Sequence, residues 1–218
     1  MRFFFAASAL TLFSITAFPT AAATAAGARI MIYGDSLSAG YGINPKDGWV
    51  SLLQAKLQPE GIAVINSSIS GETTRGGLSR IKTDLKRIGP NVVVLALGAN
   101  DGLRGLPVAD MKKNLQSMIT AIQAANAKVV LLSIQIPPNY GIEYAQQFRD
   151  LYFDLAKSNK VEKPPFLLEG VADKLELFQA DRLHPKAEAQ ARILENVLPT
   201  IRKAIDKTLA AQKSPAKS

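Results

Sequence analysis

Short apolar segments alternate with longer amphipathic segments along most of this chain, and this alternation restricts the folds open to it. The clearest apolar segment covers residues 91–97 and is bounded by Gly89-Pro90 and by Gly98. Further apolar segments cover residues 29–33, 62–65, 128–134 and, more weakly, 166–168. Segments that are apolar throughout, rather than at every second residue, indicate parallel strands that are buried on both faces.

Amphipathic patterns with helical spacing lie between the predicted strands. Residues 74–88 carry apolar side chains at steps of three and four, which predicts a helix with one buried face. The other predicted helices cover residues 48–57, 108–125, 144–158 and 185–209. Because parallel strands joined by helices require right-handed crossovers, the pattern predicts a helix–sheet–helix sandwich.

The N-terminal residues have the order of an export signal. Arg2 precedes an uncharged apolar run over residues 3–18, and small residues follow Pro19. This order predicts a signal peptide over residues 1–26 and an exported, periplasmic protein. An uncleaved anchor is the alternative, but the run is shorter than the roughly 20 residues that span a bilayer. We expect one catalytic domain over residues 27–206 and a polar tail over 207–218.

Composition argues against several classes of site. The chain has no cysteine, so it has no thiolate nucleophile and no disulfide. With a single histidine it is poorly supplied for a transition-metal site, and we expect neither a metal nor a cofactor. The net charge is +8, and the basic residues are scattered along the chain without aromatic residues between them, which argues against nucleic-acid binding. We expect at most a weak contact of this basic surface with anionic membranes.

Three successive predicted strands each lead into a polar loop that contains glycine. These loops cover residues 34–38, 67–73 and 98–102. In open α/β sheets, ligands bind beyond the carboxyl ends of the strands, where the strand order reverses. If the order is 2-1-3-4-5, then Ser36, Gly71 and Asn100 surround one crevice.

His184 is the only side chain suited to act as a base near neutral pH. A lone histidine that precedes a helix is more often a surface or capping residue. Here Asp181 lies three residues earlier, a spacing that allows its carboxylate to bind one ring nitrogen and fix the imidazole tautomer. The loop that contains Ser36 can supply the nucleophile. These partners favour a catalytic histidine.

At these residues the sequence resembles the SGNH (GDSL-like) hydrolases. The matching blocks are Gly34-Asp35-Ser36-Leu37-Ser38, Gly71, Gly98-x-Asn100-Asp101 and Asp181-x-x-His184-Pro185, in that order. Within this superfamily the chain looks most similar to the bacterial periplasmic thioesterase, lysophospholipase and arylesterase group. The resemblance implies an α/β, flavodoxin-like three-layer α/β/α sandwich with a five-stranded parallel sheet of order 2-1-3-4-5.

The resemblance also implies roles for individual residues. Ser36 would attack the carbonyl carbon, His184 would take its proton, and Asp181 would orient His184. The backbone N–H groups of Ser36 and Gly71 and the side-chain amide of Asn100 would form the oxyanion hole. Arg182 departs from the family, which usually has glycine there, so it is either strained by a positive φ or placed at the rim of the site.

Three carboxylates near the predicted site allow two interpretations. Asp35, Glu72 and Asp101 resemble the paired acids of glycoside chemistry. We favour a structural role in which they accept hydrogen bonds from loop N–H groups.

The substrate is less constrained than the reaction. We expect Leu103, Pro138, Tyr140 and Ile142 to line an acyl groove, together with Leu106 and either Leu177 or Phe178, although core packing would explain the Ile, Leu and Phe residues equally well. The expected partners are small esters, thioesters or lysolipids of short to medium chain length. A carbohydrate acyl esterase and a non-catalytic binding module remain alternatives, and the oligomeric state stays open.

Overall fold

A computed structural model of the chain describes residues 27–213. The predicted signal peptide over residues 1–26 and the last residues of the predicted tail, 214–218, lie outside this range. Among the described residues, no helix has the length and apolar character needed to cross a membrane.

A parallel sheet forms the centre of the fold. Its strands are β1 (Arg29–Gly34), β2 (Ala63–Asn66), β3 (Val92–Ala96) and β4 (Lys128–Leu131), in the order β2-β1-β3-β4. Every residue of β3 is buried, and so is every residue of β1 after the first. This confirms the predicted order of the first four strands, and burial on both faces explains the apolar sequences of β1 and β3. The edge strand β2 differs from the expectation, because its residues are only partly buried or exposed.

The fifth predicted strand is reduced to a single parallel bridge between Ser133 and Phe166. The N–H of Ser133 donates to the carbonyl of Pro165 over 2.9 Å, and the N–H of Leu167 donates to Ser133 over 3.1 Å. Pro164 and Pro165 have no N–H to donate, so a longer ladder cannot form on their side. The expected fifth strand is therefore present only as this contact at the edge of β4.

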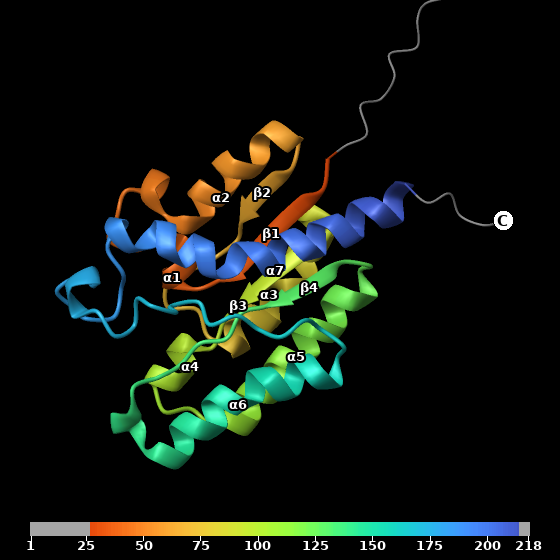
Figure 1. The fold of residues 1–218 in the computed structure, drawn as a ribbon. Helices are drawn as coiled ribbons and strands as arrows, with labels where there is room; N and C mark the ends of the chain where they lie inside the picture. The colour runs from red at the N-terminus through yellow and green to blue at the C-terminus, as the bar shows by residue number, and fades with distance from the viewer. Residues whose placement is uncertain (1–26, 214–218) are drawn as a thin grey trace, which may run out of the picture.

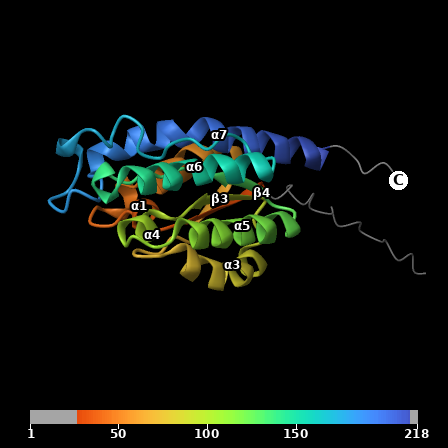
Figure 2. The ribbon, with the colours of Figure 1, turned by 90° about the horizontal axis from the view of Figure 1, so that it is seen from below.

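Helices cover both faces of the sheet. Their bounds are α1 (Ser36–Ala39), α2 (Trp49–Leu57), α3 (Thr74–Ile88), α4 (Ala99–Leu103), α5 (Val108–Ala124), α6 (Ile142–Ser158) and α7 (Ala187–Lys213). Short 3-10 turns occupy Pro45–Asp47, Gln58–Glu60, Pro138–Tyr140 and Leu175–Leu177. Helix α2 packs with α7, and α5 packs with both α3 and α6. Figure 2 shows α7 on one side of the strands and α3 with α5 on the other, which is the predicted three-layer sandwich.

A hydrogen bond between the starts of α2 and α7 joins these two helices. Trp49, the first residue of α2, is fully buried, and its backbone N–H donates to Oε1 of Gln190 in α7 over 3.1 Å. Helix α7 continues to Lys213, so residues 207–213 belong to the helix and not to a polar tail. Thr208 is buried and Lys207 pairs with Glu162 over 2.7 Å, which anchors this last part of the helix.

The strand directions place the chemically interesting loops on one side of the molecule. Because β1 and β3 are parallel neighbours, Gly34 lies beside Ala96 and the polar loops that follow them start together. In Figure 1, α1 and α4 lie on the same side of the sheet as the turn that precedes α6. The carboxyl edge of the sheet is therefore the place to examine for a site.

Helix α3 approaches β1 closely because Gly77 has no side chain. A Cβ atom at this position would lie 2.5 Å from Cδ1 of Leu97 and 3.3 Å from Sδ of Met118. The carbonyl of Gly77 also accepts a hydrogen bond of 2.7 Å from the hydroxyl of Tyr33 in β1.

Replacing Gly77 with alanine is expected to lower the free energy of unfolding by about 1–3 kcal/mol, because the added methyl group overpacks the core. Chemical denaturation measures this change. Ser79→Ala is the matched control, since Ser79 is exposed on the same helix and its substitution should change stability by less than about 0.5 kcal/mol. An unchanged Gly77→Ala protein would contradict the close packing of α3 on β1.

Candidate active site

Ser36 is held at the carboxyl end of β1 by a short capped helix. The strand ends at Gly34, and the carboxylate of Asp35 accepts the N–H of Leu37 over 3.0 Å as the N-cap of α1. Helix α1 ends at Gly40, whose φ of 75° requires the left-handed conformation that glycine adopts readily. Ser36 is the first residue of this helix, so its backbone N–H remains available to a ligand.

The structure brings Ser36, His184 and Asp181 together. Nε2 of His184 lies 2.8 Å from Oγ of Ser36, and Nδ1 lies 2.7 Å from Oδ2 of Asp181. The other carboxylate oxygen of Asp181 accepts the backbone N–H groups of Leu183 and His184, over 2.9 and 3.0 Å. The hydrogen bond from the His184 backbone, followed by those from its ring and from Leu183, lowers the pKa of Asp181 to about 2. This carboxylate is therefore ionised in the folded protein at neutral pH.

The loop that carries His184 is tied to the rest of the molecule. Phe178 and Pro185 form an antiparallel bridge, and the N–H of Gln179 donates to the carbonyl of His184 over 2.8 Å. The side chain of Gln179 donates to the carbonyl of Tyr41 over 2.8 Å, and the Tyr41 ring lies 4.5 Å from the imidazole. Tyr41 and Gln179 were not predicted as site residues, because no sequence motif marks a residue that joins two loops across the fold.

Gly71 and Asn100 lie in the second and third polar loops, next to one another. The amide of Asn100 donates one hydrogen bond to the carbonyl of Glu72 over 3.0 Å, which leaves its second N–H free for the pocket that Asn100 lines. Gly71 has a φ of 79°, so its conformation, more than a lack of space, explains the glycine. Within residues 27–213, the backbone N–H groups of Ser36 and Gly71 form no hydrogen bond.

Asp101 performs the structural role expected of it. Its carboxylate accepts the N–H of Thr74 over 2.9 Å and the hydroxyl of the same residue over 2.5 Å, which joins the start of α3 to α4. The expectation for Glu72 was wrong in its partner. Its carboxylate pairs with Nε of Arg80 over 2.8 Å instead of a loop N–H, because Arg80 reaches back from the second turn of α3.

Asp35 is a buried carboxyl group directly behind Ser36. Only 1% of its surface is exposed, and one of its oxygens has no hydrogen-bond partner within the described part of the chain. Burial raises the pKa of Asp35 to about 7, while the hydrogen bond from Leu37 opposes this shift. The site therefore contains a buried carboxyl group that titrates near neutral pH.

Arg182 adopts the left-handed backbone conformation, with a φ of 57°. A residue with a Cβ in this conformation costs on the order of 1 kcal/mol relative to glycine. Arg182 also lines the pocket next to Ser36. Both expectations for this position therefore hold: the backbone has a positive φ, and the side chain is at the site. Its N–H donates to the carbonyl of Gln179 over 2.9 Å.

A pocket of about 460 Å³ opens beside Ser36 and His184. Its apolar lining comes from α1, α4, the segment after β4, the bridge segment and the histidine loop. It consists of Leu37, Ala99, Leu103, Ile134, Ile136, Pro137, Phe166, Leu168, Ala172, Phe178 and Leu183. Its volume lies within the range of small-molecule sites. The described residues contain no cluster of three His, Asp or Glu side chains that would hold a metal ion.

Only part of the predicted acyl groove lines this pocket. Leu103 and Phe178 do, whereas Leu106, Tyr140, Ile142 and Leu177 do not, and the side chain of Pro138 is outside the described part of the chain. Ile142 is 81% exposed because the buried face of α6 is formed further along by Phe148 and Leu151. Tyr140 instead donates its hydroxyl to the carbonyl of Leu103 over 3.2 Å. Ile134 and Ile136 also line the pocket. Ile134 was expected as the last residue of a strand and Ile136 in the loop that follows it, and neither was assigned to the groove.

Comparison with known proteins gives a consistent family. The family model described as the GDSL-like Lipase/Acylhydrolase family matches residues 32–192. The chain is 46% identical to the Esterase TesA of Pseudomonas aeruginosa, covering 82% of this chain and 90% of that protein. It is 45% identical to the Arylesterase of Vibrio mimicus, covering 83% of this chain and 91% of that protein. It is 40% identical to the Thioesterase 1/protease 1/lysophospholipase L1 of Escherichia coli strain K12, covering 78% and 82%.

Solved structures give the same relationship. The crystal structure of the psychrotrophic esterase EstA from Pseudoalteromonas sp. matches with a TM-score of 0.78 and 42% identity, over 82% of this chain and 98% of that chain. The chain therefore belongs to the GDSL-like lipase/acylhydrolase (SGNH) family and is an ester hydrolase of that family.

Proposed function

We propose that this chain hydrolyses carboxylic esters and thioesters through an acyl-enzyme formed on Ser36. The observation that carries the proposal is the 2.8 Å hydrogen bond between Nε2 of His184 and Oγ of Ser36. This contact joins residues that are 148 positions apart in the sequence, and the imidazole is also bound to an ionised carboxylate. A hydroxyl with a base within hydrogen-bond distance, and a base oriented by a third group, is the arrangement that activates a serine.

The proposed reaction has two symmetrical halves. Oγ of Ser36 attacks the carbonyl carbon while Nε2 of His184 takes the hydroxyl proton. The tetrahedral intermediate collapses, the carbon–oxygen or carbon–sulfur bond breaks, and His184 gives its proton to the leaving alcohol or thiol. Water then attacks the acyl-enzyme with the same proton transfers, which releases the acid and restores Ser36. Throughout the reaction Asp181 accepts a hydrogen bond from the Nδ1–H of His184, which stabilises the imidazolium.

The oxyanion would be held by three neutral donors. The N–H groups of Ser36 and Gly71 and the amide of Asn100 come from three different loops that meet at the carboxyl edge of the sheet. Loss of one such donor typically lowers kcat by about a hundred- to a thousandfold. Asn100 is the donor that a side-chain substitution can remove.

We infer that the apolar pocket takes the acyl chain and that short- to medium-chain esters, aryl esters, thioesters and lysolipids are the substrate class. The names of the relatives, which include an arylesterase and a thioesterase/lysophospholipase, support this class. The pocket lining is dominated by aliphatic and phenyl groups, which favours an acyl chain over an acetylated sugar.

We also propose export to the periplasm with removal of residues 1–26, on the strength of the charged, apolar and small-residue order of that segment. A weak contact with lipid surfaces is consistent with this location. Exposed large apolar side chains of the described residues are Tyr41, Ile69, Leu106, Tyr140, Ile142, Leu175 and Leu183. Of these, Leu183 lines the pocket and the ring of Tyr41 lies against His184, so the proposed site has apolar groups at its exposed side that would favour lipid-borne esters.

Ser36→Ala is expected to lower ester and thioester hydrolysis by at least about a thousandfold while leaving the fold intact, because it removes the nucleophile. Ser38→Ala is the matched control, since Ser38 lies in the same short helix and its hydroxyl has no partner within residues 27–213. A fluorophosphonate probe should label wild type and Ser38→Ala but not Ser36→Ala. Undiminished hydrolysis by Ser36→Ala would exclude the proposed acyl-enzyme.

The rate constant kcat/KM is expected to fall on acidification, because protonated His184 cannot accept the Ser36 proton. Asp181 stays ionised over this range, since hydrogen bonds hold its pKa at about 2. The buried carboxyl of Asp35 also titrates near neutral pH, so the profile is measured for Asp35→Asn as well, and the acid limb should persist there. Activity that stays constant down to about pH 4 in both proteins would identify a different base.

Turnover of 4-nitrophenyl esters is expected to rise from acetate to butyrate or hexanoate, as the acyl chain fills the apolar pocket, with a gain of about 0.8 kcal/mol of binding for each buried methylene. The panel includes an acyl-CoA thioester and an acetylated sugar. Ile136→Asp should reverse the preference for longer chains, because Ile136 lines the pocket and is itself buried. A clear preference for the acetylated sugar would replace the proposed substrate class.

A further inference from the structure

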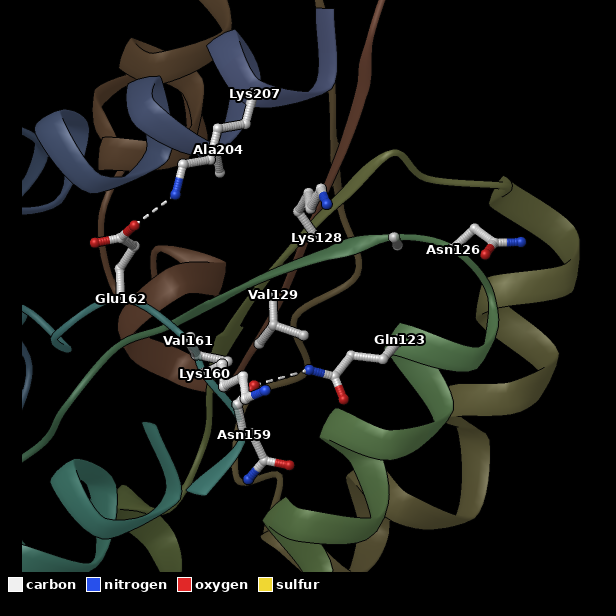
Figure 3. Close-up of a pocket in the computed structure, with 11 residues that line it drawn as sticks. Gln123, Asn126, Lys128, Val129, Asn159, Lys160, Val161, Glu162, Ala204 and Lys207 are labelled. Atoms are coloured by element: carbon white, nitrogen blue, oxygen red, sulfur yellow. Dashed lines mark hydrogen bonds and ion pairs between the residues drawn. The ribbon is translucent and has the colours of Figure 1, made fainter. Parts of the chain in front are cut away.

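Three residues other than glycine adopt a positive φ within the described part of the chain: Asn126 at 59°, Lys160 at 55° and Arg182 at 57°. Asn126 and Lys160 border a pocket at the amino end of β4 (Figure 3), which shares no lining residue with the pocket that contains Ser36. Arg182 instead lines the pocket that contains Ser36 and His184. A long cationic side chain is thus held at a position where the backbone favours glycine, directly at the proposed site.

The Arg182 side chain does not stabilise the fold through any polar contact. Within residues 27–213, its guanidinium forms no hydrogen bond and no ion pair, and the residue is exposed. The neighbouring carboxylate of Asp181 is already engaged by His184 and by two backbone N–H groups. Asp173 is the acidic residue among those that line the pocket, and it forms no ion pair with Arg182. The donors of the guanidinium are therefore available to a ligand.

The position of Arg182 in the loop indicates which part of a substrate it would meet. The interior of the pocket is apolar and suits the acyl chain, whereas Arg182 lies two residues before His184 at the exposed mouth. In the proposed reaction His184 gives its proton to the leaving group. Arg182 is therefore on the side of the pocket where the alcohol or thiol departs.

We propose that Arg182 is a specificity-determining residue that binds an anionic group, a phosphate or a carboxylate, on the leaving-group side of the ester. This inference rests on the proposed function of Ser36 and His184. The planar guanidinium donates paired N–H groups that match the oxygens of such anions. Because Arg182 is exposed, the attraction is moderate and is weakened by salt.

Three chromogenic esters test the proposal. They are neutral 4-nitrophenyl butyrate, 3-butanoyloxy-4-nitrobenzoate with the anion on the leaving group, and mono-4-nitrophenyl adipate with the anion on the acyl chain. In Arg182→Gly, kcat/KM for the nitrobenzoate ester should fall about three- to tenfold, while the neutral ester stays within about twofold. Raising the salt concentration should reduce the preference of wild type for the nitrobenzoate ester.

Lys160→Gly is the matched control, because Lys160 is also an exposed cation with a positive φ but lines a different pocket, which Figure 3 shows. Both glycine variants should raise Tm, by about 2–4 °C each, because both remove the strain of a residue with a Cβ in the left-handed backbone conformation. Only Arg182→Gly should change the ratio of kcat/KM between the charged and neutral esters. Arg182→Lys should retain most of the preference, and Arg182→Asn, which tolerates the same backbone, should lose it.

The outcomes separate this inference from the proposed function. An equal fall for all three esters in Arg182→Gly and Arg182→Asn would mean that the loop was distorted, and it would overturn the role of the charge. A selective fall for the adipate ester alone would overturn the assignment to the leaving-group side. Failure of the wild-type protein to hydrolyse even the neutral butyrate would instead count against the proposed function.

Discussion

The parallel pairing of β1 with β3 is the constraint on which the site depends. These two strands are buried along nearly their whole length, and their pairing sets the residues after Gly34 beside those after Ala96. A one-residue shift in this register would exchange the faces of the strand and bury the wrong side chains. The tightly specified core therefore also fixes the distance between the serine loop and the asparagine loop.

Prediction from sequence succeeded where a local pattern carried the information. The buried strands read as continuous apolar runs, and the polar loops with glycine marked their carboxyl ends. The fifth strand failed because Phe166 follows two prolines, whose missing N–H groups stop the ladder after one bridge. The tail was placed too early because the burial of Thr208 and the ion pair of Lys207 are tertiary contacts that a polar composition does not reveal.

In the candidate site too, contacts between residues close in the sequence could be predicted, and contacts between distant segments could not. Asp181 and His184 are three residues apart, so their contact could be anticipated from spacing. The acyl pocket could not, because Ile136, Phe166 and Phe178 come from separate segments that meet only in the folded chain. Ile142 was assigned to the pocket by its place in the sequence, yet the phase of α6 turns it outward. Side-chain direction at a helix start is decided by packing further along the helix.

The position of Trp49 determines what the intrinsic fluorescence of this protein can report. It is the chain's single tryptophan, and it is enclosed between α2 and α7 with no part in the pocket beside Ser36. Its emission spectrum therefore follows the integrity of one helical layer and is insensitive to occupancy of the pocket. Optical detection of ligand binding in this protein requires a chromophore on the ligand or a second indole placed near the mouth.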